Sequence, residues 1–153
     1  MDNHEIARVL HDIADMLEIS GDENFFRIRA YRYAGHAVDD LTQPLAGLDE
    51  EQVRGTLGIG ADLAGKIVEL IGTGEMALYV ELRERVPPGL LELRQVSGLG
   101  PKRIRQLAQI ARITNRDDLA RAVESGALRT IRGFGPKTEQ RILRSLERLR
   151  ERG

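Results

Sequence analysis

A short pattern of two glycines around one apolar residue occurs three times in this chain of 153 residues. An apolar residue also lies one or two places before the first glycine of each copy, and another lies nine places after it. The three patterns are Gly58-Ile59-Gly60, Gly98-Leu99-Gly100 and Gly133-Phe134-Gly135. The flanking apolar residues are Leu57, Val96 and Ile131 before the turns, and Ile67, Leu107 and Ile142 after them. This frame predicts a short helix, a tight turn and a second helix in each copy.

The composition of these turns indicates what they can contact. Glycine has no side chain and permits backbone angles closed to other residues, so a phosphate chain can approach closely. Gly100 and Gly135 are predicted either to need positive φ or to face phosphate with bare backbone. The next helix begins at once and directs its free N–H groups and its positive dipole end to the same surface. The pattern therefore favours a grip on the phosphodiester backbone without base readout. The alternative is an ordinary helical corner capped by glycine.

The rest of the chain has helical spacing and few strand signals. One buried face of a first helix is predicted from Ile6, Val9, Leu10, Ile13, Met16 and Leu17. Ser20 and Glu23 have capping-box spacing and predict a second helix over about 24–41. Further helices are predicted near 50–56, 61–71, 75–85, 89–95, 101–112, 116–124 and 136–150. The predicted fold class is all-α, with short loops.

The two halves of the chain carry opposite net charge. Residues 1–86 hold 8 Lys/Arg and 17 Asp/Glu, whereas residues 87–153 hold 15 and 7, which gives net charges of −9 and +8. In the second and third copies a proline, suited to the first position of a helix, and a lysine follow the turn: Pro101-Lys102 and Pro136-Lys137. The asymmetry indicates an anionic partner for the second half. We also predict two domains, 1–86 and 87–153, joined through Pro87-Pro88-Gly89.

Other residue types exclude several classes of site. The chain has no cysteine, which excludes disulfides, cysteine-ligated metals and thiol catalysis. His4, His11 and His36 do not cluster in the sequence, so no metal site built from side chains is predicted. No apolar run approaches the roughly 18 residues of a membrane span, and no leader opens the chain. We therefore expect no membrane partner and a cytoplasmic, nucleoid-associated protein.

The chain resembles the N-terminal region of bacterial family X DNA polymerases in three features that occur in the same order. These features are residues 1–8 (MDNHEIAR), residues 24–32 (NFFRIRAYR) and the three hairpins. The resemblance implies a 5′-deoxyribose phosphate (dRP) lyase-like helical domain with the first helix-hairpin-helix motif. A fingers-like domain with two further motifs follows it. It also implies DNA as the partner and a monovalent cation, Na⁺ or K⁺, at hairpin carbonyls, with no other cofactor. The adjacent pairs Asp39-Asp40 and Asp117-Asp118 fall in predicted helices, so we expect no palm domain and no polymerase activity from this chain alone.

The lyase reaction needs a lysine that attacks the sugar aldehyde as a neutral amine. The resemblance places this nucleophile in the second helix of the first hairpin, where Lys66 lies, and places Tyr31 beside the lyase pocket. Asp62 and Glu69 lie four residues before and three residues after Lys66 and would raise its pKa. The alternative is therefore that Lys66 is a solvated cation paired with Asp62.

The remaining candidates are cations that can contact phosphate. Arg27, Arg29 and Arg32 alternate with aromatic residues and could bind a 5′-phosphate and stack an unpaired base. Alternatively, Phe25, Ile28 and Tyr31 form a core face and these arginines are solvated. The predicted DNA-binding set comprises the six turn glycines, these three arginines, Lys102, Arg103 and Lys137. The predicted function is non-sequence-specific binding to gapped, nicked or abasic DNA in repair, with a Lys66-dependent lyase or a helical protein-interaction adaptor as alternatives.

Overall fold

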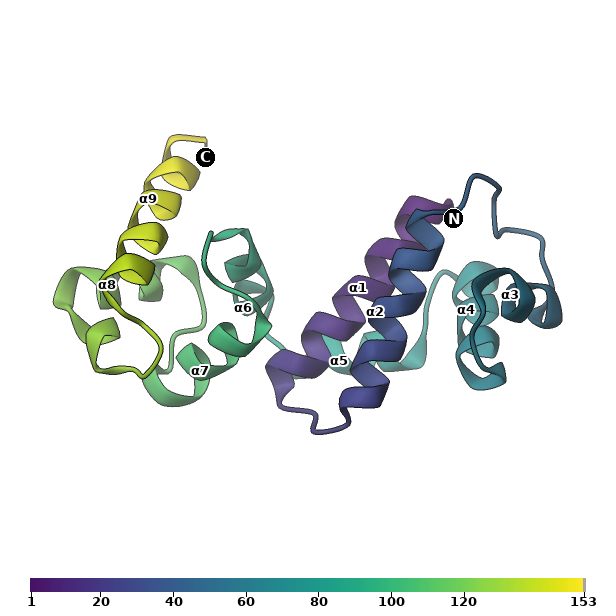
Figure 1. Cartoon of the computed structure of the whole chain (residues 1–153), viewed down its shortest axis with the longest axis horizontal. Helices are drawn as coiled ribbons and strands as arrows, with labels where there is room; N and C mark the ends of the chain where they lie inside the picture. The colour runs from purple at the N-terminus through teal and green to yellow at the C-terminus, as the bar shows by residue number, and fades with distance from the viewer. Residues whose placement is uncertain (153) are drawn as a thin grey trace. The chain divides into compact units, whose positions relative to one another are not determined.

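Residues 1–152, the part that this computed structural model describes, form helices joined by loops, and no β-strand occurs there (Figure 1). The predicted all-α class is confirmed. The chain divides into two compact units, residues 1–85 and residues 86–153, one residue before the boundary predicted from the sequence. No helix within residues 1–152 combines the length and the apolar composition that crossing a membrane requires.

The first unit is built around a pair of long helices, α1 (Asn3–Ser20) and α2 (Phe25–Asp39), which lie side by side (Figure 1). The six apolar residues predicted to form the buried face of the first helix are each at most 4% exposed. Arg32 of α2 donates to Asp15 and Glu18 of α1, each at 2.8 Å. Helix α5 (Ala77–Arg85) also packs on α1, and the Tyr79 hydroxyl donates to Asp12 at 3.2 Å. Apolar burial and polar contacts thus both hold α1 in place.

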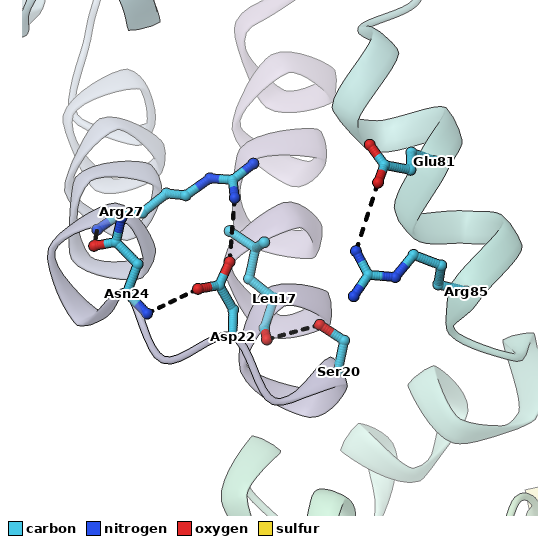
Figure 2. Close-up of polar contacts among 7 residues, drawn as sticks. All are labelled: Leu17, Ser20, Asp22, Asn24, Arg27, Glu81 and Arg85. Carbon is cyan, nitrogen blue, oxygen red and sulfur yellow. Dashed lines mark hydrogen bonds and ion pairs between the residues drawn. The ribbon is translucent and has the colours of Figure 1, made fainter.

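The connection between α1 and α2 differs from the prediction. Ser20 is the last residue of α1, and its hydroxyl donates to the Leu17 carbonyl at 2.9 Å, so it does not cap α2 (Figure 2). Asn24 caps α2 instead, because its side-chain oxygen accepts from the Arg27 N–H at 3.1 Å. Asp22 fixes the loop by accepting from the Asn24 N–H and from the Arg27 guanidinium (Figure 2). The capping-box prediction for Ser20 was wrong because α1 continues through that residue to its C-cap, Gly21.

The first hairpin consists of α3 (Glu50–Leu57) and α4 (Ala61–Thr73). Asp49 and Gln52 form a reciprocal capping box that starts α3. Gly58 ends α3 in the left-handed conformation, and α4 begins three residues later. Leu57 and Ile67, which flank the turn, are buried.

The second unit contains the other two hairpins. Its elements are α6 (Pro88–Glu92), the 3-10 helix η1 (Leu93–Gln95), α7 (Pro101–Ala111), α8 (Arg116–Ser125), the 3-10 helix η2 (Ala127–Thr130) and α9 (Pro136–Arg152). The helix predicted over 89–95 is therefore an α-helix that tightens into a 3-10 turn. Helix η2 was not predicted, because a single turn of four residues is too short to show helical spacing in the sequence. It follows Gly126, the left-handed residue that ends α8, and it buries Leu128.

Candidate nucleic-acid interface and lyase site

The two glycines of each turn have different conformations. The first glycine has positive φ in all three copies, with values of 67° at Gly58, 92° at Gly98 and 93° at Gly133. A side chain is strained in this region, which explains glycine there. The second glycine is extended at Gly60 and Gly100, with φ of −75° and −88°. A Cβ atom added at Gly60, Gly100 or Gly135 would meet nothing within 4 Å, so these positions present bare backbone to open space.

The second and third turns repeat the same backbone contacts. The Leu99 N–H donates to the Val96 carbonyl at 3.2 Å, and the Phe134 N–H donates to the Ile131 carbonyl at 3.1 Å. Leu99 and Phe134, at the centres of the turns, are buried. The first turn differs, because the Ile59 N–H donates to the Arg54 carbonyl and the Ile59 side chain stays half-buried. The six apolar residues that flank the three turns are all buried.

Each second glycine is followed at once by a helix. Helices α4, α7 and α9 begin at Ala61, Pro101 and Pro136, and no side chain caps α4 or α7. The unpaired N–H groups in the first turn of each helix are therefore not covered by a side chain of the preceding glycine. Lys102 and Lys137, in the first turns of α7 and α9, are exposed. This arrangement can bind an anion by backbone N–H groups, helix dipole and ammonium together.

Arg103, predicted to contact DNA, joins the two turns of the second unit. Its guanidinium donates to the Gly98 carbonyl at 2.9 Å and to the Gly133 carbonyl at 3.4 Å. It also lies over the Phe134 ring, 5.7 Å from the centroid. One side chain therefore contacts the first glycine of both turns and fixes their spacing.

This contact bears on the cation expected at the hairpin carbonyls. At the second and third turns the carbonyl of the first glycine accepts a hydrogen bond from the Arg103 guanidinium. The positive charge of the guanidinium would repel a metal cation at the same oxygen. Each turn has further backbone carbonyls, so the monovalent cation expected at the hairpin carbonyls stays a prediction at all three turns.

Replacing Arg103 by lysine should destabilise the second unit by about 1 kcal/mol, since lysine keeps the charge but lacks the planar fork that reaches both carbonyls. Denaturant unfolding of the chain, followed by an amide probe in α7 or α9, measures this change. Arg105→Lys on the same helix is the control. Equal stability of the two variants would show that the Arg103 contacts do not hold the turns together.

In the first unit, the predicted lyase residues come together from α2 and α4. The Lys66 ammonium donates to Asp62 at 3.0 Å, within α4. Tyr31 of α2 is only 3% exposed, and its buried hydroxyl has no hydrogen-bond partner among residues 1–152. Lys66, Arg27 and Asp62 all act electrostatically on that hydroxyl. The structure thus gathers two cations and a carboxylate around a buried hydroxyl.

The charge state of this cluster follows from its contacts. The hydrogen bond to Asp62 raises the pKa of Lys66 above its usual value, although partial burial opposes the rise. Burial raises the pKa of Tyr31, and the nearby Lys66 and Arg27 oppose that rise. At neutral pH Lys66 is therefore an ammonium paired with Asp62, which is the alternative that the sequence left open.

The three arginines of α2 have separate environments. Arg27 pairs with Asp22 at 3.2 Å, and Arg29 lies over the Phe26 ring at 5.4 Å. Arg32 forms ion pairs with two carboxylates of α1 and so links α2 to α1. Its contact with phosphate stays a prediction. Ile28 and Tyr31 are buried, whereas Phe25, which the alternative interpretation placed on the core face, is 60% exposed. Phe26 and Tyr33 of α2 are exposed as well.

The sequence reasoning also missed a contact between two histidines. His11 and His36 were predicted to be apart, but their ring centroids lie 4.9 Å from each other. The prediction was wrong because the packing of α1 on α2 brings together residues that are 25 positions apart. The spacing of His36 and Asp39 on one helix face was the one signal available in the sequence.

Comparison with known proteins places both units in related families. Residues 1–76 match the family "Helix-hairpin-helix domain", and residues 90–148 match the family "SAM-like Helix-hairpin-helix tandem". Over 146 residues, 95% of its length, the chain is 32% identical to "DNA polymerase/3'-5' exonuclease PolX" of Bacillus subtilis (strain 168). The chain spans 25% of the length of that protein. Both units therefore contain helix-hairpin-helix domains, and the chain is similar over 95% of its length to the N-terminal part of a bacterial family X DNA polymerase.

Proposed function

We propose that this chain binds DNA through the phosphodiester backbone, without sequence preference, as the DNA-holding part of a repair polymerase that acts on gapped, nicked or abasic sites. The observation that carries the proposal is the open backbone at Gly60, Gly100 and Gly135. Each of these glycines lies directly before the N-terminus of a helix. No base-reading side chain is needed for such a contact, because phosphate and backbone N–H groups suffice.

Charge and similarity support the same proposal. The second unit carries the net positive charge and both exposed turn lysines, so it supplies most of the affinity for duplex DNA. The acidic first unit contributes at ends and gaps, through its single hairpin and the cations of α2. The related protein is named as a DNA polymerase, which is consistent with a DNA-holding role for the matching region.

The direct test is charge reversal at the two turn lysines. Lys102→Glu combined with Lys137→Glu should weaken binding to all duplex sequences about equally, and should lower the salt slope by about one unit per lost phosphate contact. Fluorescence anisotropy with labelled duplexes across a range of salt concentrations measures both effects.

The matched control is Arg148→Glu combined with Arg152→Glu. It changes the net charge equally, but Arg148 lies roughly 18 Å along α9 from Pro136. If the control and the lysine double variant lose the same affinity, only the overall charge matters and the hairpins are not the contact site. If neither variant loses affinity at low salt, the DNA-binding proposal fails and the adaptor alternative gains support.

A second candidate function is a Schiff-base lyase acting on abasic or 5′-deoxyribose phosphate ends. The observation that favours it is the buried Tyr31 hydroxyl without a hydrogen-bond partner in residues 1–152, beside Lys66 and Arg27. A sugar hydroxyl or phosphate oxygen could satisfy that group. In this proposal Lys66 is the nucleophile and Arg27 holds the phosphate. Before Lys66 attacks, its ammonium group must separate from Asp62 and lose a proton to solvent.

A further inference from the structure

Three potential metal ligands meet on the surface of the α1–α2 pair. His11 comes from α1, and His36 and Asp39 come from the last turn of α2. His11 Nε2 lies 2.9 Å from Asp39 Oδ2, and one donor atom from each of the three side chains lies within 4.8 Å of the others. The cluster therefore offers two imidazole nitrogens and one carboxylate oxygen at a single point.

The local sequence creates room for this arrangement. A Cβ atom at Gly35 would lie only 2.7–2.9 Å from three atoms of the His11 ring, so the ring lies directly against the α2 backbone. Glycine in a helix interior is unfavourable by about 1 kcal/mol relative to alanine. Here it lets an imidazole from α1 reach the face of α2 that carries His36 and Asp39. These two residues are three positions apart and share one helix face.

We propose that His11, His36 and Asp39 form a binding site for a borderline divalent transition-metal ion, with Zn²⁺ as the representative ion. Two nitrogens and one oxygen suit Zn²⁺, whereas Mg²⁺ prefers an all-oxygen set. Three protein ligands leave one position of a tetrahedral ion for water. The site is distinct from the hairpin turns and from the Lys66 cluster, and the proposal does not depend on DNA binding.

The observed spacing requires little adjustment. Zinc–nitrogen and zinc–oxygen bonds of about 2.0–2.2 Å place neighbouring tetrahedral ligand atoms about 3.3 Å apart. His11 Nε2 and Asp39 Oδ2 are already near this separation. His36 is exposed, so its ring can turn to bring the third donor in. The C-terminal end of α2, with its partial negative charge, also favours a cation at this place.

A bound ion would connect the two helices that form the core of the first unit. Within residues 1–152, the His11–Asp39 hydrogen bond is the only direct polar contact between these three side chains. Zinc would replace that hydrogen bond with three coordinate bonds from two helices. The expected consequence is that the first unit unfolds at a higher temperature when zinc is bound.

The test is isothermal titration of the untagged whole chain with Zn²⁺, repeated with Mg²⁺. The wild-type chain should bind one Zn²⁺ per chain, and Mg²⁺ at the same concentrations should give no saturable binding. His36→Ala and His11→Gln should each weaken zinc binding by at least about tenfold. Thermal unfolding followed by an amide probe in α1 should shift upwards with zinc in the wild type and not in these variants.

Two further variants separate this site from other zinc contacts. His4→Ala removes an exposed histidine in the first turn of α1 and should leave zinc binding unchanged. Gly35→Ala keeps all three ligands but displaces the His11 ring, and should weaken binding as the ligand variants do. No saturable zinc binding to the wild type would overturn the proposal. Equal affinity of the wild type, His36→Ala and His11→Gln would overturn it as well.

Discussion

Lys66→Ala should abolish covalent trapping of this chain by borohydride on DNA that carries an abasic site or a 5′-deoxyribose phosphate. A Schiff base between a lysine and the sugar aldehyde is reducible, so each trapped complex reports one attack by an amine. The chain has only two other lysines, Lys102 and Lys137. Alanine at either of these should reduce trapping only as far as it reduces DNA affinity. Gel separation of the reduced adducts, with duplex affinity measured in parallel, provides the two readouts.

The pH dependence of trapping tests the role of Asp62. The hydrogen bond to Asp62 raises the pKa of Lys66, so the neutral amine is scarce at pH 7 and trapping should become faster as the pH increases. Asp62→Asn removes the charge that stabilises the ammonium and lowers the pKa of Lys66. Its trapping profile should therefore shift to lower pH, with a faster rate near neutrality. Glu69→Gln is the matched control, because it removes one negative charge from α4, keeps the hydrogen bond between Asp62 and Lys66, and changes a residue that is not among the groups shifting the pKa of Lys66 in the structure.

Two results would contradict the lyase proposal. Trapping that persists in Lys66→Ala would move the chemistry to another amine, and the α-amino group of Met1 is the first competitor. Selective acetylation of that amine tests this route. Absence of any adduct from the wild type up to about pH 9 would remove the lyase and leave the DNA-binding proposal in place.

Valine at the second glycine of the two basic turns should weaken DNA binding strongly while leaving the fold intact. Gly100 is extended, with φ of −88° and ψ of 174°, which any residue can adopt. A side chain at Gly100 or Gly135 would meet open space in the free chain. In the complex the same side chain would occupy the place of a phosphate strand. Gly100→Val and Gly135→Val should each cost at least about tenfold in duplex affinity, or about 1.4 kcal/mol.

The first glycines of the same turns provide the matched comparison. Gly98 and Gly133 have φ near +92°, so alanine there is strained and should lower the free energy of unfolding by about 1–2 kcal/mol. Anisotropy titrations and denaturant unfolding on all four variants separate the two effects. If Gly100→Val and Gly135→Val bind DNA like the wild type, the turns serve packing alone.

The sequence by itself determined the helical class and the position of each hairpin. Apolar spacing is a local property, and the six apolar residues predicted to form one face of the first helix are buried. The first glycine of each pair marks the turn for the same reason, because tolerance of positive φ belongs to the residue itself. The local signal at Ser20 led to a wrong prediction, because α1 extends through that residue and Asn24 caps α2.

The tertiary structure decided which side chains meet across elements. Arg103 contacts Gly133, 30 residues away, and His11 contacts Asp39, 28 residues away. Arg32 is one of three similar arginines in the sequence, and it forms ion pairs with two carboxylates of α1. The packing of one helix on another sets these distances, and residue spacing along a single helix carries no information about them. For that reason the hairpin backbone could be predicted from the sequence, whereas the arginine bridge and the histidine cluster required the folded chain.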